Sequence, residues 1–395
     1  MEAIIQQKVD LIAECLFSKV EKAPEDTFGL YSGEFGFLLF LLYYARYSQN
    51  EDHSILAEKY ADRLLQQFAV REKLHTFCSG HSGILYLLDC LDEDEVIGMD
   101  VSEIRPFLEN YLIFRMRQDI QRQNFDFMHG AMGVGLYFLK RKTNPEYIQE
   151  IVDFLYRTAE KDTTNNIFKW KSVVNSEDNI IGYNLALSHG ISSILIFLSR
   201  AIRNGIINDQ VRELLTGSVN FVFANQKDYT QFGSYFPSYI QINTQNPVSK
   251  SRMGWCYGDL GIGLALIQAG KALDNSSWEE KGHEILLQST RRRQHNETFV
   301  NDAGICHGSA GIAMIFRRMF LETHREEYKE ATSFWIDQTL HFSRYEDGLV
   351  GYKALEKDGM KCDYSLLSGI AGIGLVLLSY LVDDHQHWDE MFLLR

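Results

Sequence analysis

The chain has 395 residues, of which 45% are hydrophobic and 23% charged, so it has ample material for a folded core. Its formal net charge is −14 at pH 7 and it contains no basic run, which excludes nucleic acid as the expected partner because nothing would neutralise the phosphates. Six cysteines at irregular spacing do not form the pattern of a disulfide framework. We therefore expect a reducing, cytoplasmic setting.

The first predicted element is an amphipathic helix in the opening stretch MEAIIQQKVDLIAECL. Early acidic residues, and the lack of a basic region and a cleavage site, distinguish it from a signal peptide. The longest apolar run, residues 366–382, has 17 residues but includes three glycines and two serines. We predict a buried helix there, and no transmembrane segment in the chain.

One short pattern, Gly-x-x-Gly followed by an apolar run, recurs along the chain. The first glycines of its seven copies are Gly33, Gly80, Gly130, Gly190, Gly258, Gly308 and Gly369. The copy at 190 has Ser193 in place of its second glycine. The copies span 336 residues over six intervals, a mean period of 56 residues. That period accommodates two helices of about four or five turns each, with their connections.

Two kinds of helix alternate in this pattern. Each apolar run is nearly continuous, which predicts a helix buried on most sides. The segments between are one-sided: residues 51–68 place Tyr60, Leu64 and Phe68 on one face and charged residues on the other. We predict an all-α single domain over residues 1–395, an α/α toroid in which seven helical hairpins close a ring with the buried helices inside. An open α-solenoid is the alternative, and the continuous apolarity of the inner runs favours the ring.

Two intervals exceed the period: 60 residues separate the third and fourth copies, and 68 the fourth and fifth. The second contains SYFPSYIQINTQNPVSK, residues 234–250, which predicts an extended flap leading into the fifth copy. Neither interval is long enough for a separate additional lobe. The acidic stretch DDHQHWDE near the C-terminus is expected to be a solvated end.

Two copies of the pattern carry a cysteine at the same place. Cys256 lies two residues before its glycine in GWCYGDLGIG, and Cys306 does so in GICHGSAGIA, followed by His307. In a ring, equivalent positions of adjacent repeats lie side by side on one rim, so these three residues should converge. Two cysteines and a histidine with a fourth position open are the pattern of a catalytic zinc. A single cysteine before a helix is usually a core residue, and Cys78, in the second copy, is assigned that structural role.

Neighbouring repeats add polar groups to the same rim. His189 lies one residue before the glycine of the fourth copy, and Asp126 lies four before that of the third. Taken alone, each fits a hydrogen-bonded structural residue as well as a catalyst. His129, also one residue before its glycine, indicates that position alone does not mark function. Arg252 and Tyr257 flank the first cysteine of the metal pattern and can bind a substrate carbonyl or stabilise negative charge.

WCYG and, about fifty residues later, CHG, preceded by SHG and a series of Gly-x-x-Gly motifs, resemble the lanthionine synthetase C-like family. The likeness runs from about Gly29 to Tyr380. It implies a seven-hairpin toroid with one zinc ion per chain. It also implies a bacterial class I lanthipeptide cyclase, which adds cysteine thiols of a dehydrated precursor peptide to dehydroalanine or dehydrobutyrine. No kinase-like or dehydratase segment precedes the repeats, so a stand-alone cyclase is expected, with a dehydratase and an ABC transporter as partners that can hold it at the membrane.

The resemblance also assigns residues. The family's zinc ligands match Cys256, Cys306 and His307. Its catalytic histidine matches His189 with Asp126 as acidic partner, and its arginine and tyrosine match Arg252 and Tyr257. A free thiol with a pKa near 8.5 is only about 3% ionised at pH 7, which zinc would correct. His189 would then protonate the α-carbon and Arg252 would steady the enolate oxygen. The missing second glycine of the fourth copy is a departure that would shift the helix after His189.

Two other classes stay open at this point. Protein prenyltransferase subunits are also zinc-dependent α/α rings, but they resemble six-hairpin rings with an aspartate among the ligands. A relative that binds or transfers glutathione or a peptide would share the residues named here. His189, Asp126 and Arg252 argue against a degenerate binding module.

Overall fold

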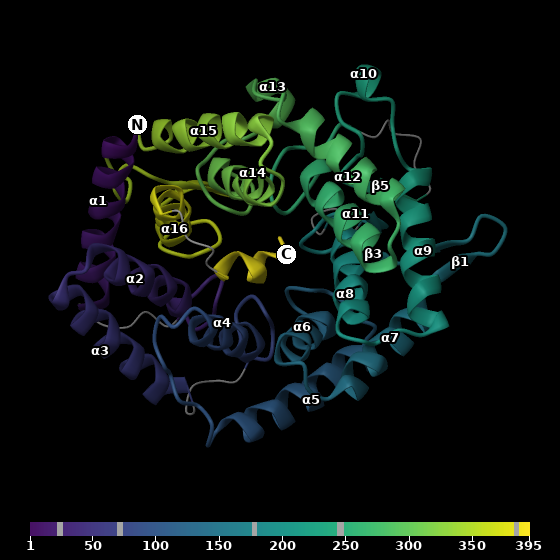
Figure 1. Ribbon diagram of the computed structural model, residues 1–395, viewed down its shortest axis with the longest axis horizontal. Coiled ribbons are helices and arrows are strands. Elements are labelled where there is room, and N and C mark those ends of the chain that lie inside the picture. The colour runs from purple at the N-terminus through teal and green to yellow at the C-terminus, as the bar shows by residue number, and fades with distance from the viewer. Residues whose placement is uncertain (22–26, 69–73, 176–179, 243–248, 383–386) are drawn as a thin grey trace. The chain divides into compact units, whose positions relative to one another are not determined.

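The computed structural model describes residues 1–21, 27–68, 74–175, 180–242, 249–382 and 387–395. The chain divides into two compact units, one of residues 1–114 with 301–394 and the other of residues 115–300 with 395. Both units consist mainly of helices (Figure 1). Within the described ranges, no helix is both long and apolar enough to cross a membrane.

Each of the seven pattern glycines is the N-cap of an apolar helix, as the repeat predicts. The helices are α2 (Glu34–Ser48), α4 (His81–Glu93), α6 (Ala131–Arg141), α8 (Ile191–Arg203), α11 (Asp259–Leu273), α14 (Ser309–Thr323) and α16 (Ile370–Leu381). They are buried along most of their length; α16 is buried from Ile370 to Ser379. The expectation of a buried helix in residues 366–382 is therefore confirmed.

A second set of helices packs against the first with one face only. The set comprises α1 (Glu2–Glu21), α3 (Glu51–Phe68), α5 (Arg105–Gln121), α7 (Pro145–Thr158), α9 (Asp209–Ala224), α12 (Ser276–Ser289) and α15 (Glu326–His341). In α3 the buried face includes Tyr60, Leu64 and Phe68, as the spacing predicts. In the first unit α2 packs on α3, α14 on α15 and α16 on α1; in the second, α6 packs on α7, α8 on α9 and α11 on α12.

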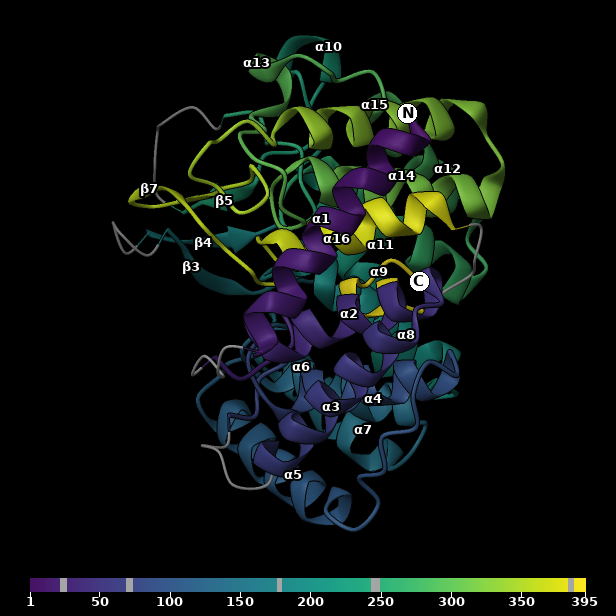
Figure 2. The ribbon, with the colours of Figure 1, turned by 90° about the vertical axis from the view of Figure 1, so that its left-hand side faces the viewer.

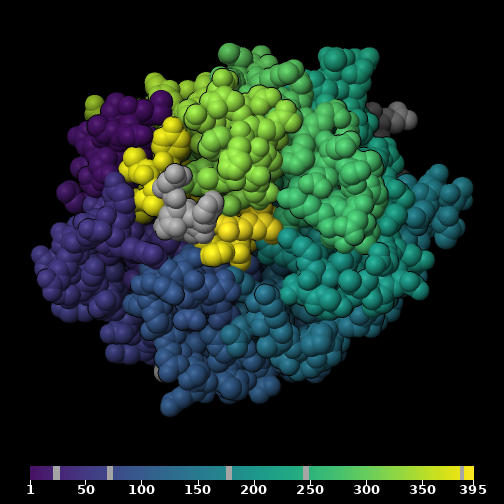
Figure 3. All heavy atoms as spheres, viewed as in Figure 1, coloured from purple at the N-terminus to yellow at the C-terminus, as the bar shows by residue number. Residues whose placement is uncertain are grey.

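The first and last helices of the chain meet in the first unit. α16 packs against both α1 and α2, and α1 runs beside it in Figure 2. In the space-filling view, yellow atoms of the C-terminal region lie beside the purple atoms of α1 and the yellow-green atoms of α14 and α15 (Figure 3). This unit therefore contains both the earliest and the latest repeats.

The C-terminal residues pack into the first unit instead of forming a solvated end. A 3-10 helix, η1 (Trp388–Phe392), buries Trp388 and Phe392, and Asp389 forms a buried ion pair with Arg318. The Tyr31 hydroxyl donates to the carbonyl of Met391. The expected solvated end is wrong for residues 387–395, because the apolar side chains after the acidic run supply a buried surface. Residues 383–386 lie outside the described ranges.

The two long intervals of the second unit together form a small antiparallel sheet. Its strands are β3 (Lys171–Asn175), β4 (Ile180–Asn184) and β5 (Tyr239–Gln241), in the order β3-β4-β5. A hairpin of β1 (Glu160–Asp162) and β2 (Ile167–Lys169) precedes it. The predicted extended flap thus supplies a strand, although its residues 243–248 lie outside the described ranges. The remaining short elements are α10 (Tyr229–Phe232), α13 (His295–Thr298), β6 (Ala354–Glu356) and β7 (Gly359–Lys361).

Backbone hydrogen bonds align the residues that lie two positions before each helix glycine. In the second unit, the N–H of Ser188 donates to the carbonyl of Cys256 at 3.4 Å. In the first unit, Cys306 donates to Leu367, and Leu367 in turn to Tyr31, each at 2.9 Å. Within each unit, this position of one repeat therefore lies directly beside the same position of the next.

Candidate metal centre and active site

Cys256 lies in the loop of residues 251–258 that leads into α11, and it is only 4% exposed. The loop ends at Gly258, whose φ of +96° differs from the −139° to −100° of the six other N-cap glycines. A Cβ atom at this position would lie 2.2 Å from the carbonyl oxygen of Arg252. Only glycine fits both the left-handed conformation and the close approach. The turn that places Cys256 therefore depends on Gly258.

A buried ion pair supports the same loop. Asp259, the first residue of α11, lies 3.4 Å from Arg292, and their side chains are 0% and 1% exposed. Arg292 also donates to the carbonyl of Ser251 at 2.6 Å. The carboxylate of Asp259 accepts the backbone N–H groups of Tyr235 and Phe236 at 2.9 and 3.0 Å. The pair thus joins the start of the Cys256 loop, the start of α11 and the segment that leads to β5.

Asp126 and His189 form a hydrogen-bonded pair. The distance from His189 Nδ1 to Asp126 Oδ2 is 2.7 Å, and the imidazole is 35% exposed. The other carboxylate oxygen of Asp126 accepts the backbone N–H of His129 at 2.8 Å, which fixes the carboxylate. Because a carboxylate only accepts, Nδ1 carries the proton and Nε2 is left for other partners. The structure therefore brings together the two residues that the sequence placed on one rim.

The environment of His189 raises its pKa. Burial acts to lower the pKa, but the hydrogen bond and the charge of Asp126, together with the nearby Cys256, outweigh it. A larger fraction of His189 is therefore protonated near neutral pH than of a free histidine. This is the state that a proton donor needs.

A pocket adjoins His189 on the side of the small sheet. Its lining combines His189 and Asn184 with aromatic rings, namely Phe125, Trp170, Tyr183 and Phe221. Tyr183 and Asn184 belong to β4, so the sheet gives the histidine an aromatic wall. The sequence analysis did not predict this contribution, because the strands come from two intervals that each looked irregular.

Three further residues complete this side of the site. Arg252 and Tyr257 are half-buried on the Cys256 loop, as their place in the sequence requires. No hydrogen bond or ion pair to a described residue occupies the guanidinium of Arg252. The ring of His129 stacks on His189, with centroids 5.8 Å apart and planes 16° apart. His129, which the sequence did not assign to the site, thus lies against the candidate catalytic imidazole.

Cys306 and His307 lie in the loop that leads into α14, and both are half-buried. His307 Nε2 lies 3.1 Å from Oδ2 of Asp302, a carboxylate that is 1% exposed. Asp302 in turn accepts the backbone N–H of Gly304 at 3.1 Å and that of Leu355 at 2.8 Å. Sequence reasoning missed Asp302, although an aspartate four residues before the cysteine was visible.

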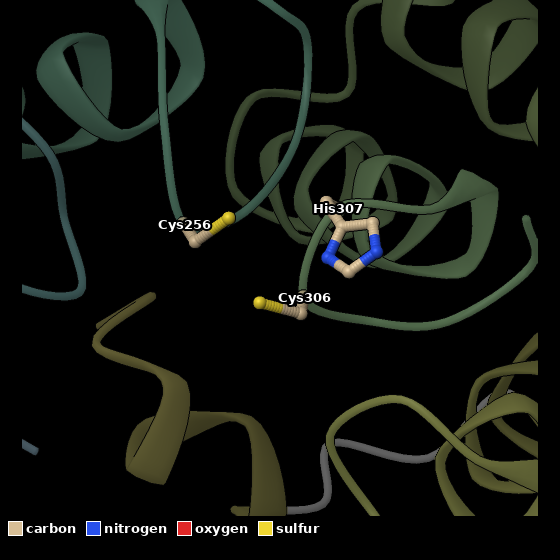
Figure 4. A group of neighbouring side chains, drawn as sticks. All are labelled: Cys256, Cys306 and His307. Atoms are coloured by element: carbon tan, nitrogen blue, oxygen red, sulfur yellow. The ribbon is translucent and has the colours of Figure 1, made fainter. Parts of the chain in front are cut away.

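The three candidate ligands are neighbours. The Sγ atoms of Cys256 and Cys306 and a ring nitrogen of His307 all lie within 4.8 Å of one another. In Figure 4 the two sulfur atoms and one ring nitrogen point toward a common space. Tetrahedral zinc, with bonds of about 2.0–2.3 Å, places its ligand atoms roughly 3.3–3.8 Å apart, so small side-chain shifts suffice. Two thiols and an imidazole are also ligands that zinc favours. The residues fit a zinc ion with one open position.

Comparison with known proteins agrees with this arrangement. The family model described as lanthionine synthetase C-like protein matches residues 24–393. The chain belongs to the lanthionine synthetase C-like family. Nisin biosynthesis protein NisC of Lactococcus lactis subsp. lactis is 23% identical over 377 residues, covering 88% of this family member and 85% of NisC. Glutathione S-transferase LANCL1 of Danio rerio is 23% identical over 221 residues, covering 55% of this chain and 50% of that protein.

A solved structure supports the fold of this lanthionine synthetase C-like protein. Nisin cyclase superposes with a TM-score of 0.78 at 19% identity, covering 99% of this chain and 97% of that chain. Nisin cyclase is an α/α toroid, so the predicted fold class is confirmed. The few short strands in the long intervals are an addition to the predicted helices.

Proposed function

We propose that this protein is a zinc-dependent lanthionine cyclase. It would join cysteine thiols of a dehydrated precursor peptide to dehydroalanine or dehydrobutyrine residues and so form thioether rings. The observation that carries the proposal is the cluster of Cys256, Cys306 and His307, whose ligand atoms lie within 4.8 Å of one another. Membership of the family and the similarity to nisin cyclase support it.

Cys256, Cys306 and His307 would hold one zinc ion per chain. When bound, the ion would supply the acidity that ionises a substrate thiol of pKa near 8.5 at neutral pH. The cysteines are suited to this role because Cys256 is buried while Cys306 and His307 are half-buried, which leaves one side of the cluster accessible.

His189 is the proposed proton donor. Addition of the substrate sulfur to the β-carbon moves the π electrons of the dehydro residue into an enolate, whose α-carbon must then gain a proton. The His189 imidazolium can give that proton from Nε2, because Nδ1 is engaged by Asp126 at 2.7 Å. The thiol hydrogen is thereby replaced on sulfur by carbon, and one hydrogen ends on the α-carbon. Asp126 holds the tautomer and stabilises the charged ring throughout.

Arg252 is the proposed partner of the enolate oxygen. It lies on the same loop as Cys256, and its guanidinium has no partner among the described residues. Such a preorganised cation favours the state in which negative charge develops on the oxygen. Tyr257, on the same loop, is a further candidate for binding the substrate carbonyl.

The dehydrated precursor implies further partners. We propose a dehydratase that supplies the dehydro residues and an ABC transporter that exports the product. In this proposal the cyclase works in the cytoplasm and reaches the membrane through these partners. Neither a nucleic acid nor a second cofactor is needed for the reaction.

Addition of glutathione is the second candidate function. It is favoured by the partial similarity to Glutathione S-transferase LANCL1 of Danio rerio. The same cluster and the same His189 would serve an intermolecular thiol equally well.

One experiment separates the two functions. The zinc-loaded protein is incubated with a dehydrated, cysteine-containing precursor peptide in the presence and absence of glutathione, and the products are treated with a thiol-alkylating reagent before mass spectrometry. Cyclisation leaves the peptide mass unchanged and removes its alkylation, whereas glutathione transfer adds the mass of glutathione. A peptide that stays fully alkylated and unmodified in both reactions would contradict both functions.

A further inference from the structure

We propose that Asp302 is a positioning residue for the metal ligand His307, holding the imidazole so that Nδ1 is presented to the ion. The inference rests on the proposed function, since it concerns a ligand of the same zinc ion. Asp302 is no ligand itself: its role is to accept the Nε2–H of His307 across the 3.1 Å contact.

The contact fixes which ring nitrogen is available. A carboxylate can only accept, so Nε2 carries a proton when it faces Asp302 and its lone pair is not available to a metal. Nδ1 then has the free lone pair, and one nitrogen of His307 points toward the two sulfur atoms in Figure 4. A ligating histidine whose second nitrogen donates to a carboxylate is more basic and is held in one orientation. The geometry therefore assigns Asp302 both a tautomeric and an orienting effect.

The position of Asp302 in the repeat provides an internal comparison. Asn124, Asn184 and Asp363 occupy the same place, six residues before the helix glycine. In all four, the side-chain oxygen Oδ1 accepts the backbone N–H two residues further on, at 2.6–3.3 Å. That bond is a local turn, common to the repeats. Asp302 makes it with Oδ1 and uses Oδ2 for His307, so its second oxygen has a separate function.

The burial of Asp302 supports a role for its charge. The side chain is 1% exposed, and no Lys or Arg of the described chain pairs with it. Besides His307, its contacts are the backbone N–H groups of Gly304 and Leu355. A buried carboxylate without a basic partner is costly unless hydrogen bonds offset its desolvation. The imidazole N–H is the side-chain group that does so here.

Asp302→Asn is the informative substitution. Asparagine already serves the local turn in two other repeats, so Oδ1 should keep its bond to Gly304. The amide in place of Oδ2 cannot accept from His307 Nε2. We expect zinc affinity, measured by competition with a chromophoric chelator, to fall by about 10- to 100-fold. The melting temperature of the metal-free protein should match that of the control below.

Asp363→Asn is the matched control, because it alters the same repeat position in the same unit without contacting a histidine. Its zinc affinity should stay within about twofold of the unmodified protein. Asp302→Asn should also have no further effect in a His307→Ala background, since the coupling of two residues that act together vanishes when one is removed. An unchanged affinity in Asp302→Asn, or an equal loss with and without His307, would overturn the inference.

A measurement on the unmodified protein completes the test. In long-range nitrogen–proton spectra of the zinc-loaded, histidine-labelled protein, His307 should show a proton on Nε2 and a metal-shifted Nδ1. A proton on Nδ1 would refute the proposed role of Asp302 while leaving the zinc site intact. Failure of the unmodified protein to bind stoichiometric zinc would instead refute the proposed function, so the two failures are distinguishable.

Discussion

The loops before α11 and α14 occupy the same place in their repeats and present a cysteine at the same position, yet they are supported differently. Around Cys256 the backbone turn is held from outside the loop, by the Asp259–Arg292 pair, and ends at Gly258 with φ of +96°. Around Cys306 the following glycine has an ordinary φ of −104°, and the support comes from Asp302 within the loop. One loop is stabilised as a backbone conformation and the other through a ligand side chain.

This difference has a physical reason. The first loop connects to the segment that leads to β5, so several chain segments must be joined before Cys256 is placed. The second loop offers two adjacent ligands, and an imidazole needs its ring orientation fixed as well as its position. A repeated fold can therefore present equivalent ligands while each repeat uses its own means of support.

Removal of either cysteine should have the largest effect and should erase the difference between the loops. In Cys256→Ala and in Cys306→Ala, we expect zinc content to fall from one ion per chain to near zero, since two protein ligands cannot hold the ion. Elemental analysis of the purified proteins measures this. Cys78→Ala, at the same repeat position, should keep its metal; stoichiometric zinc in both ligand variants would show the assignment to be wrong.

Arg292→Met should affect the first loop and spare the second. It leaves the fully buried carboxylate of Asp259 without its counter-charge, which should lower the free energy of unfolding by about 3–5 kcal/mol. Urea denaturation followed by circular dichroism measures the change. A partial recovery in the double variant Asp259→Asn/Arg292→Met is expected, because the uncompensated charge is then gone.

The control for this prediction is Arg117→Met, which removes an arginine from the exposed pair with Glu150. An exposed ion pair contributes about 0–1 kcal/mol, so this variant should unfold almost as the unmodified protein does. Equal destabilisation in the two arginine variants would mean that the buried pair has no special role in supporting the Cys256 loop.

His189→Asn tests whether catalysis can be separated from both ligand loops. The substitution leaves all three proposed ligands in place, so zinc content should be unchanged. Thioether formation on a dehydrated peptide should slow by about 100-fold or more, because the α-carbon loses its proton donor. Mass spectrometry of a time course measures the rate. Full activity in this variant would transfer the role to Tyr257 or water.

Zinc removal should have the smallest effect on the fold. Each unit has its own helical core, whereas small zinc domains unfold without metal because they lack one. Chelated protein should keep its helical circular dichroism and a cooperative melt, with the transition lowered by only a few degrees. Cyclisation should fall to the uncatalysed level and return when zinc is added. Loss of the helical signal at room temperature would mean that the ion is structural.

The local features were predictable from the sequence, and the long-range ones were not. The seven glycines, the buried helices and the alignment of Cys306 with its neighbours follow from a repeated pattern that each segment carries by itself. The role of Asp302 depends on Leu355, 53 residues away, and that of Arg292 on Asp259, 33 residues away. Neither distance is a multiple of the repeat, so no periodicity reveals it.

The small sheet and the C-terminal residues illustrate the same limit. β5 pairs with β4 from an earlier interval, and each strand is too short to identify alone. Trp388 and Phe392 follow an acidic run that reads as solvent-exposed, and only their packing in the first unit reveals their burial. Patterns predict what a segment is, whereas these residues depend on what a segment meets.

The hydrogen-bonded position two residues before each helix glycine has a consequence for how such a protein can change over generations. At this position the backbone groups are committed to the neighbouring repeat, while the side chain varies: it is tyrosine at 31, serine at 188, cysteine at 306 and leucine at 367. Inheritance of the scaffold and trial of new chemistry are thereby uncoupled. A single codon change can introduce or remove a reactive group on the rim while the bonds that align the repeats persist.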